Sequence, residues 1–183
     1  MLAQELGYLN ADFRRSVLTS DPVRFAQQWA ETVHYYLFEW THFTDLLGWL
    51  GAPPSPEDNP FRLWLRMIYL KISDFIAAAM VVSQVFAVRL AVLTLAMPVF
   101  VLFGLVALVD GLVQRDLRRW GGGRESSFVY HHAKVALLPT LVLTWIVYLG
   151  LPFSLHPNFV IFPFAVLFAL ALAITAATFK KYL

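Results

Sequence analysis

Apolar residues recur near the start of the chain with the spacing of an amphipathic helix. They follow one another at steps of four and three residues, at Leu2, Leu6, Leu9, Phe13 and Val17. This spacing places them on one face of a helix, while polar residues such as Glu5 lie largely on its other faces. The pattern predicts a first helix over residues 2–18.

A second helix is predicted over residues 22–50. Asp21 followed by Pro22 is a typical helix start, because the aspartate caps free N–H groups and the proline has none to leave unpaired. Apolar residues then keep heptad a and d spacing at Ala26, Trp29, Val33, Tyr36, Trp40, Phe43, Leu47 and Leu50. A seam this rich in aromatic residues must be buried, either on neighbouring helices of the same chain or on a partner subunit. Its candidate contact residues are Trp29, Val33, Tyr36, Trp40, Phe43 and Leu47.

The pair Asn59–Pro60 repeats the start signal and predicts a helix over residues 60–75. Beyond Arg89, the segment 90–109 has 20 residues without a charge, close to the ~20 that cross ~30 Å of hydrocarbon. The residues between these two segments, Phe75–Val88, either lie on a membrane surface or belong to one long helix. We favour a continuous or gently broken helix, because no turn residues separate the two parts.

Two further apolar segments, 135–151 and 159–178, complete a set of three predicted membrane spans. Small residues recur every fourth position in the last span, at Ala169, Ala173 and Ala177, a spacing that lets another helix approach closely. The stripe packs against the span 135–151 in one interpretation and against another subunit in the alternative.

These elements predict an all-α membrane protein with a helical region over residues 1–75 and a membrane domain over residues 76–183. The composition agrees, since 59% of the residues are hydrophobic and only 14% are charged, against about 25% in soluble domains. The chain has no cysteine, which excludes disulfides, thiolate metal sites and cysteine nucleophiles.

Charge is divided unevenly along the chain and predicts its orientation in the membrane. The polar loop 110–134, between two predicted spans, holds Arg115, Arg118, Arg119, Arg124 and Lys134 against three acidic residues. Basic loops stay on the cytoplasmic side of the inner membrane. The loop 110–134 and the C-terminus are therefore expected in the cytoplasm, and the acidic residues 1–75 in the periplasm.

The loop is the first candidate functional site. Its candidate residues are Arg115, Arg118, Arg119, Trp120, Arg124, Tyr130, His131, His132 and Lys134. Three interpretations stay open: a flexible turn with orienting charges, a docking site for a cytoplasmic partner, and a site for lipid phosphate. Direct contact with nucleic acid is disfavoured, because membrane topology explains the same charges and three acids dilute them.

Catalytic and metal chemistry is disfavoured elsewhere. The pairs Glu31–His34 and Glu39–His42 have the Glu-x-x-His spacing of di-iron sites, but both lie on one predicted helix about 12 Å apart. The glycine run at residues 121–123 lacks the phosphate-loop spacing. The three spans contain no Asp, Glu, Lys, Arg or His, which argues against transport. We therefore expect no cofactor, no metal and no enzyme activity.

The loop sequence RDLRRWGGGRESSFVYHHAK resembles a family of membrane proteins encoded in integrating conjugative elements. The segments LGYLNADF and QQWAETVHYYLF extend the resemblance through most of the chain. It implies a role in DNA transfer between bacteria through a type IV secretion-like apparatus, and an additional membrane span upstream of residue 1. The expected partners are other membrane proteins of that apparatus, its coupling ATPase and membrane lipids.

Within this context the sequence favours a non-catalytic inner-membrane scaffold or assembly subunit. One alternative is a regulator of membrane-complex assembly, or a factor that excludes incoming transfer. The other alternative is a permease or channel subunit, which predicts a polar cavity among the spans.

Overall fold

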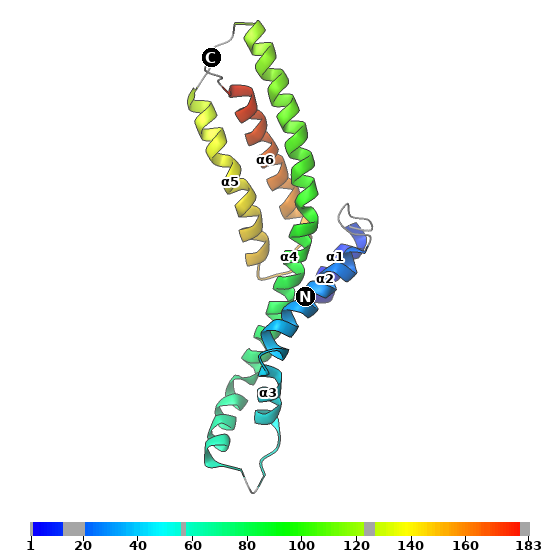
Figure 1. Cartoon of the computed structure of the whole chain (residues 1–183), viewed down its shortest axis with the longest axis vertical. Helices are drawn as coiled ribbons and strands as arrows, with labels where there is room; N and C mark the ends of the chain where they lie inside the picture. The colour runs from blue at the N-terminus through cyan, green and yellow to red at the C-terminus, as the bar shows by residue number, and fades with distance from the viewer. Residues whose placement is uncertain (1, 13–20, 56–57, 123–126, 180–183) are drawn as a thin grey trace. The chain divides into compact units, whose positions relative to one another are not determined.

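The computed structural model describes residues 2–12, 21–55, 58–122 and 127–179, and every regular element in these ranges is a helix (Figure 1). The chain divides into two compact units, and the boundary between Ala91 and Val92 falls within helix α4 (Pro60–Trp120). The described residues up to Ala91 form the first unit. Those from Val92 onward form the second.

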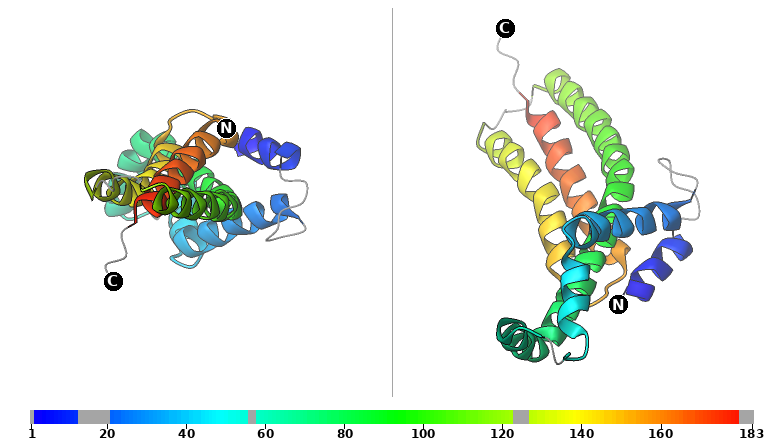
Figure 2. Two further views of the ribbon diagram at one scale, coloured as in Figure 1. Left: turned by 90° about the horizontal axis from the view of Figure 1, so that it is seen from above. Right: turned by 60° about the horizontal axis from the view of Figure 1, so that its bottom comes forward.

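The first unit contains α1 (Leu2–Asp12), α2 (Pro22–His34), the short π-helix η1 (Tyr35–Glu39), α3 (Phe43–Gly51) and the first part of α4. Helix α2 begins where the sequence predicts, since the Asp21 side chain accepts a hydrogen bond from the Arg24 N–H at 3.1 Å. Figures 1 and 2 show α3 alongside the first turns of α4. Of the first predicted helix, 2–18, the structure describes residues 2–12, which form α1; residues 13–20 lie outside the described ranges.

The single helix predicted over residues 22–50 is wrong, because the structure interrupts it between α2 and α3. The Trp40 N–H donates to the Tyr35 carbonyl at 2.8 Å, five residues back, which is the hydrogen bond of a π-turn. His42 then adopts a left-handed conformation with φ of 53°. The wider turn and the reversed φ change the direction of the helix, so the heptad positions before and after the break do not form one seam.

Helix α4 has 61 residues and joins segments that the sequence analysis treats separately. It runs without a break through Phe75–Val88, which confirms the alternative of one continuous helix. It also continues to Trp120, so the predicted loop 110–134 is wrong over most of its length. The reason is local: good helix formers dominate residues 112–119, and the first glycines after them are Gly121 and Gly122.

The second unit contains the rest of α4, α5 (Ser127–Gly150) and α6 (Pro157–Thr178). Figures 1 and 2 show α5 and α6 as antiparallel neighbours, with this part of α4 beside them. The predicted spans 135–151 and 159–178 fall almost wholly within α5 and α6. By length and composition, α4, α5 and α6 are each able to cross a membrane.

Helices α4 and α6 approach each other closely at Gly111. A Cβ atom added there would lie 2.5 Å from the carbonyl oxygen of Ala173 and 2.7 Å from the Cβ of Ala176. Further along, the rings of Phe100 and Phe168 meet edge to face with centroids 6.1 Å apart. The small residue Ala173 therefore serves a contact with α4, whereas our first interpretation placed this stripe against the span 135–151.

Replacing Gly111 with alanine should destabilise the second unit by about 2 kcal/mol, because the added methyl group meets backbone that has no room to move. Gly150→Ala is the matched control, since nothing lies within 4 Å of its added Cβ. Thermal unfolding of the detergent-purified proteins measures both effects. Equal melting temperatures for the two variants would show that α4 and α6 do not pack as described.

Candidate functional site

The basic residues of the predicted loop lie on the last turns of α4 and the first turns of α5. The Arg118 guanidinium donates a hydrogen bond to the carbonyl oxygen of Ala177, near the end of α6. A cation that binds the last carbonyls of a helix satisfies acceptors that have no partner within the helix. Arg118 therefore fastens the end of α4 to the end of α6, which sets it apart from an unattached loop residue.

The two residues that follow Arg118 are available to a partner. Arg119 is exposed, and Trp120 is 91% exposed. With Asp116 they line a small polar hollow at the end of α4. Arg115 is half-buried and contacts Asp116 at 3.4 Å. An exposed tryptophan beside an arginine is a typical contact pair at protein interfaces and membrane surfaces.

The candidate residues on α5 also include some that make contacts within the second unit and some that are exposed. The Tyr130 ring packs against Phe179 at 5.9 Å between centroids, and the Lys134 ammonium lies 5.9 Å from the centre of the Tyr130 ring. His131 and His132 are exposed, and the Nδ1 of His132 lies 2.9 Å from the Phe128 carbonyl on the preceding turn. Arg124 lies outside the described residues.

The predicted aromatic seam does not form one face. Trp29, Val33, Phe43 and Leu47 are half-buried on α2 and α3, whereas Tyr36 and Trp40 are 61% and 68% exposed at the interruption. With two exposed neighbours they make up a set of exposed apolar residues at the interruption, here called the η1 patch: Tyr35, Tyr36, Leu37 and Trp40. Tryptophan and tyrosine contribute large contact areas at interfaces. The η1 patch is therefore the strongest candidate contact surface of the first unit.

The histidine that precedes the η1 patch is held within the first unit. The Nδ1 of His34 lies 3.1 Å from the Gln84 side-chain nitrogen on α4, and its Nε2 lies 4.0 Å from a Glu39 oxygen. Within the described ranges no three metal-binding side chains gather. The contacts of His34 serve to pack α2 against α4.

Glu5 and Arg89 form an ion pair that the sequence pattern does not predict, since it assigns Glu5 to a polar face. Arg89 Nη2 and Nε lie 2.9 Å and 3.0 Å from Glu5 Oε1, and the two side chains are 5% and 0% exposed. The sequence did contain one signal for this pair: Arg89 is the single charged residue in an otherwise apolar segment, so it needs an anionic partner if it is buried. The pair fastens α1 to α4 within the first unit.

A second cluster of charges fixes the connection between α3 and α4. Arg62 pairs with Asp58, donates to the Trp49 carbonyl at 2.9 Å and lies 4.9 Å from the centre of the Trp49 ring. The Ser55 N–H donates to Asp58 at 2.7 Å and holds the pKa of that carboxyl below its ordinary value. Burial opposes this pKa shift, while Arg62 and Arg66 reinforce it.

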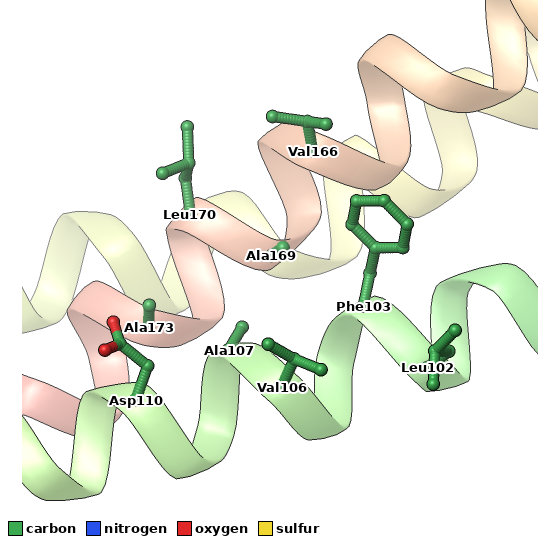
Figure 3. Close-up of a pocket in the computed structure, with 9 residues that line it drawn as sticks. All are labelled: Leu102, Phe103, Val106, Ala107, Asp110, Val166, Ala169, Leu170 and Ala173. Atoms are coloured by element: carbon green, nitrogen blue, oxygen red, sulfur yellow. The ribbon is translucent and has the colours of Figure 1, made fainter.

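Between α4 and α6 lies an apolar groove of about 370 Å³ (Figure 3). Ala169 and Ala173 form part of its wall, and Phe103 lies across from them on α4. Asp110 is the one charged residue among its lining residues, and its carboxylate accepts a hydrogen bond from Gln114 at 2.7 Å. A lining of this kind fits lipid or another apolar surface.

Comparison with known proteins gives one match. A family model described as IncC plasmid conjugative DNA transfer protein DtrJ-like matches residues 1–180. The match therefore covers both units. No curated protein and no solved structure matches the chain.

Arg89→Met should destabilise the first unit by roughly 3–5 kcal/mol, because it leaves the buried Glu5 carboxylate without its cation. The double variant Glu5→Leu with Arg89→Met should recover most of that loss. A double-mutant cycle on thermal unfolding in detergent measures the coupling. Additive effects of the two substitutions would contradict a direct pair.

Acid should weaken the connection between α3 and α4. Since the pKa of Asp58 is lower in the folded protein than its ordinary 3.8, its contacts stabilise the fold above that value and are lost as pH falls below it. Asp58→Asn should flatten the dependence of the unfolding temperature on pH in this range. Asp74→Asn, at an exposed position of α4, is the control and should retain the wild-type slope.

Proposed function

The chain belongs to the DtrJ-like family of conjugative DNA transfer proteins, and from that premise we propose that it is a non-catalytic scaffold or assembly subunit of the inner-membrane part of a conjugative DNA-transfer apparatus. The family confirms the conjugative context that the sequence predicts. Its description refers to a plasmid, so an origin in an integrating conjugative element stays a prediction.

We propose that residues 90–109 of α4, together with α5 and α6, cross the inner membrane, with the basic ends of these helices in the cytoplasm. The contact between Arg118 and Ala177 supports this orientation, because it brings the end of α4 and the end of α6 to the same end of the second unit. Residues 110–122 and the start of α5 carry most of the basic residues of that unit. Positive charge gathered at one end of a helical bundle favours the cytoplasmic side.

In this orientation residues 1–75 lie in the periplasm, where the η1 patch contacts other membrane proteins of the apparatus. Arg119 and Trp120 face the cytoplasm, where they contact cytoplasmic components such as the coupling ATPase, with anionic lipid as the alternative ligand. Direct binding of nucleic acid is not part of the proposal.

The family match carries the assignment to conjugation, and the exposure of the η1 patch supports a role in assembly. A protein that stands alone in solution rarely leaves a tyrosine–tryptophan cluster uncovered. A channel subunit is disfavoured by the apolar lining of the groove between α4 and α6. An assembly regulator or exclusion factor stays the alternative, and it differs in one respect: it does not remain in the purified apparatus.

The double variant Tyr36→Ala with Trp40→Ala tests this function. Each truncation should weaken partner binding by roughly 2 kcal/mol, the cost that defines a hot-spot residue of an interface. Donor cells carrying the variant should transfer less DNA, and affinity purification with mass spectrometry should recover fewer transfer proteins. Gln28→Ala, an exposed polar change on α2, is the control.

Two outcomes would contradict the scaffold. In the first, the wild-type chain purifies without any transfer protein, while loss of the chain still reduces DNA transfer, as expected of a regulator. In the second, the double variant retains wild-type partners and wild-type transfer.

A further inference from the structure

The first part of α4 carries a second heptad stripe, and this one lies on an unbroken helix. Apolar residues occupy eight successive a and d positions at alternating steps of four and three residues, at Phe61, Leu65, Ile68, Ile72, Phe75, Ala79, Val82 and Phe86. Seven of them are exposed, and Leu65 is half-buried. The stripe is about 38 Å long at ~1.5 Å per residue.

The polar residues of this part of α4 avoid the stripe. Lys71, Asp74 and Gln84 occupy other heptad positions, and Gln84 faces α2 through its contact with His34. The next d position after Val82 is Arg89, which is buried against Glu5 of the same chain. The stripe therefore ends where the helix becomes covered by its own chain.

Lipid alone does not account for this stripe. From Phe75 to Val109, α4 has 35 residues with Arg89 as the single charge, about 52 Å of helix against ~30 Å of hydrocarbon. If residues 90–109 cross the bilayer, the stripe lies outside its hydrocarbon core. An apolar stripe in water is unfavourable, and a repeat of 3.5 residues fits the surface of another helix.

We propose that the α4 stripe packs in parallel, and in register, against the same stripe of a second copy of this chain. The membrane supplies the geometry, because two copies inserted in the same direction present identical helices at the same height. Like positions then face each other across a two-fold axis, as in most homodimers. The inference rests on the proposed crossing at residues 90–109 and is independent of the role in DNA transfer.

The charges flanking the stripe permit this arrangement. In a parallel pair each g position meets the e position five residues later in the other helix. These contacts would pair Trp64 with Tyr69, Lys71 with Ile76 and Ala78 with Ser83 of the second copy, so none of them brings like charges together. The stripe thus fits a second copy without an electrostatic penalty.

The absence of cysteine from the sequence makes disulfide crosslinking a direct test. Val82→Cys lies on the stripe, and its neighbour Val81→Cys, at a c position, is a matched control: the two valines are 65% and 52% exposed. Ile68→Cys and Met67→Cys repeat the comparison two heptads earlier. Each variant of the full chain is oxidised with copper phenanthroline in native membranes, and the dimer is measured by non-reducing electrophoresis.

Val82→Cys and Ile68→Cys should give roughly tenfold more dimer than their neighbours, because only facing positions come within the ~7 Å between Cα atoms that a disulfide allows. Equal yields for Val81→Cys and Val82→Cys would overturn the proposal. So would an absence of dimer in all four variants. DNA transfer by each variant is measured separately from crosslinking. The failure of the dimer proposal can therefore be distinguished from the failure of the scaffold proposal.

Discussion

The buried ion pair between Arg89 and Glu5 is the interaction that fastens α1 to α4 within the first unit. An arginine that stands alone in an apolar helix costs several kcal/mol when it is buried, unless an anion and hydrogen bonds compensate its charge. Glu5 supplies both from α1, with two contacts of about 3 Å to one carboxylate oxygen. As a result the charge of Arg89 is compensated where it is buried, and α1 is held against α4.

The same principle governs the charged residues further along α4. Asp110 receives a hydrogen bond from Gln114 one turn later, and Arg118 binds the Ala177 carbonyl near the end of α6. These contacts hold two of the polar side chains in a segment whose residues are themselves good helix formers. Arg119 and Trp120 remain exposed at this end of the second unit, where they can contact other molecules.

Composition and periodicity were sufficient to predict an all-helical chain, three apolar segments and the helix start at Asp21. They were insufficient for the break at residues 40–42, because a π-turn and a left-handed His42 leave no mark on a heptad pattern. They also failed for Glu5, since an amphipathic pattern assigns a carboxylate to the solvent side and cannot show a partner 84 residues away. The end of α4 was missed for a third reason: a charged segment between two spans predicts which side of the membrane it occupies, and says nothing about whether it is helical.

Both candidate contact surfaces of the first unit consist of apolar side chains that their own helices leave uncovered. The η1 patch is rich in aromatic residues, as expected for contact with a different protein. The α4 stripe is long and regular, as expected for contact with another helix. A small unit with two such surfaces suits a subunit held between a copy of itself and another component of a larger assembly.

The orientation of the chain in the membrane is the central claim, and one labelling experiment tests it. Trp40→Cys and Trp120→Cys place single thiols at exposed positions of the first and second unit. A membrane-impermeant maleimide applied to cells with a permeabilised outer membrane should label Trp40→Cys at once, and Trp120→Cys only after the inner membrane is broken. Labelling of Trp120→Cys in intact spheroplasts, with Trp40→Cys protected, would contradict the account.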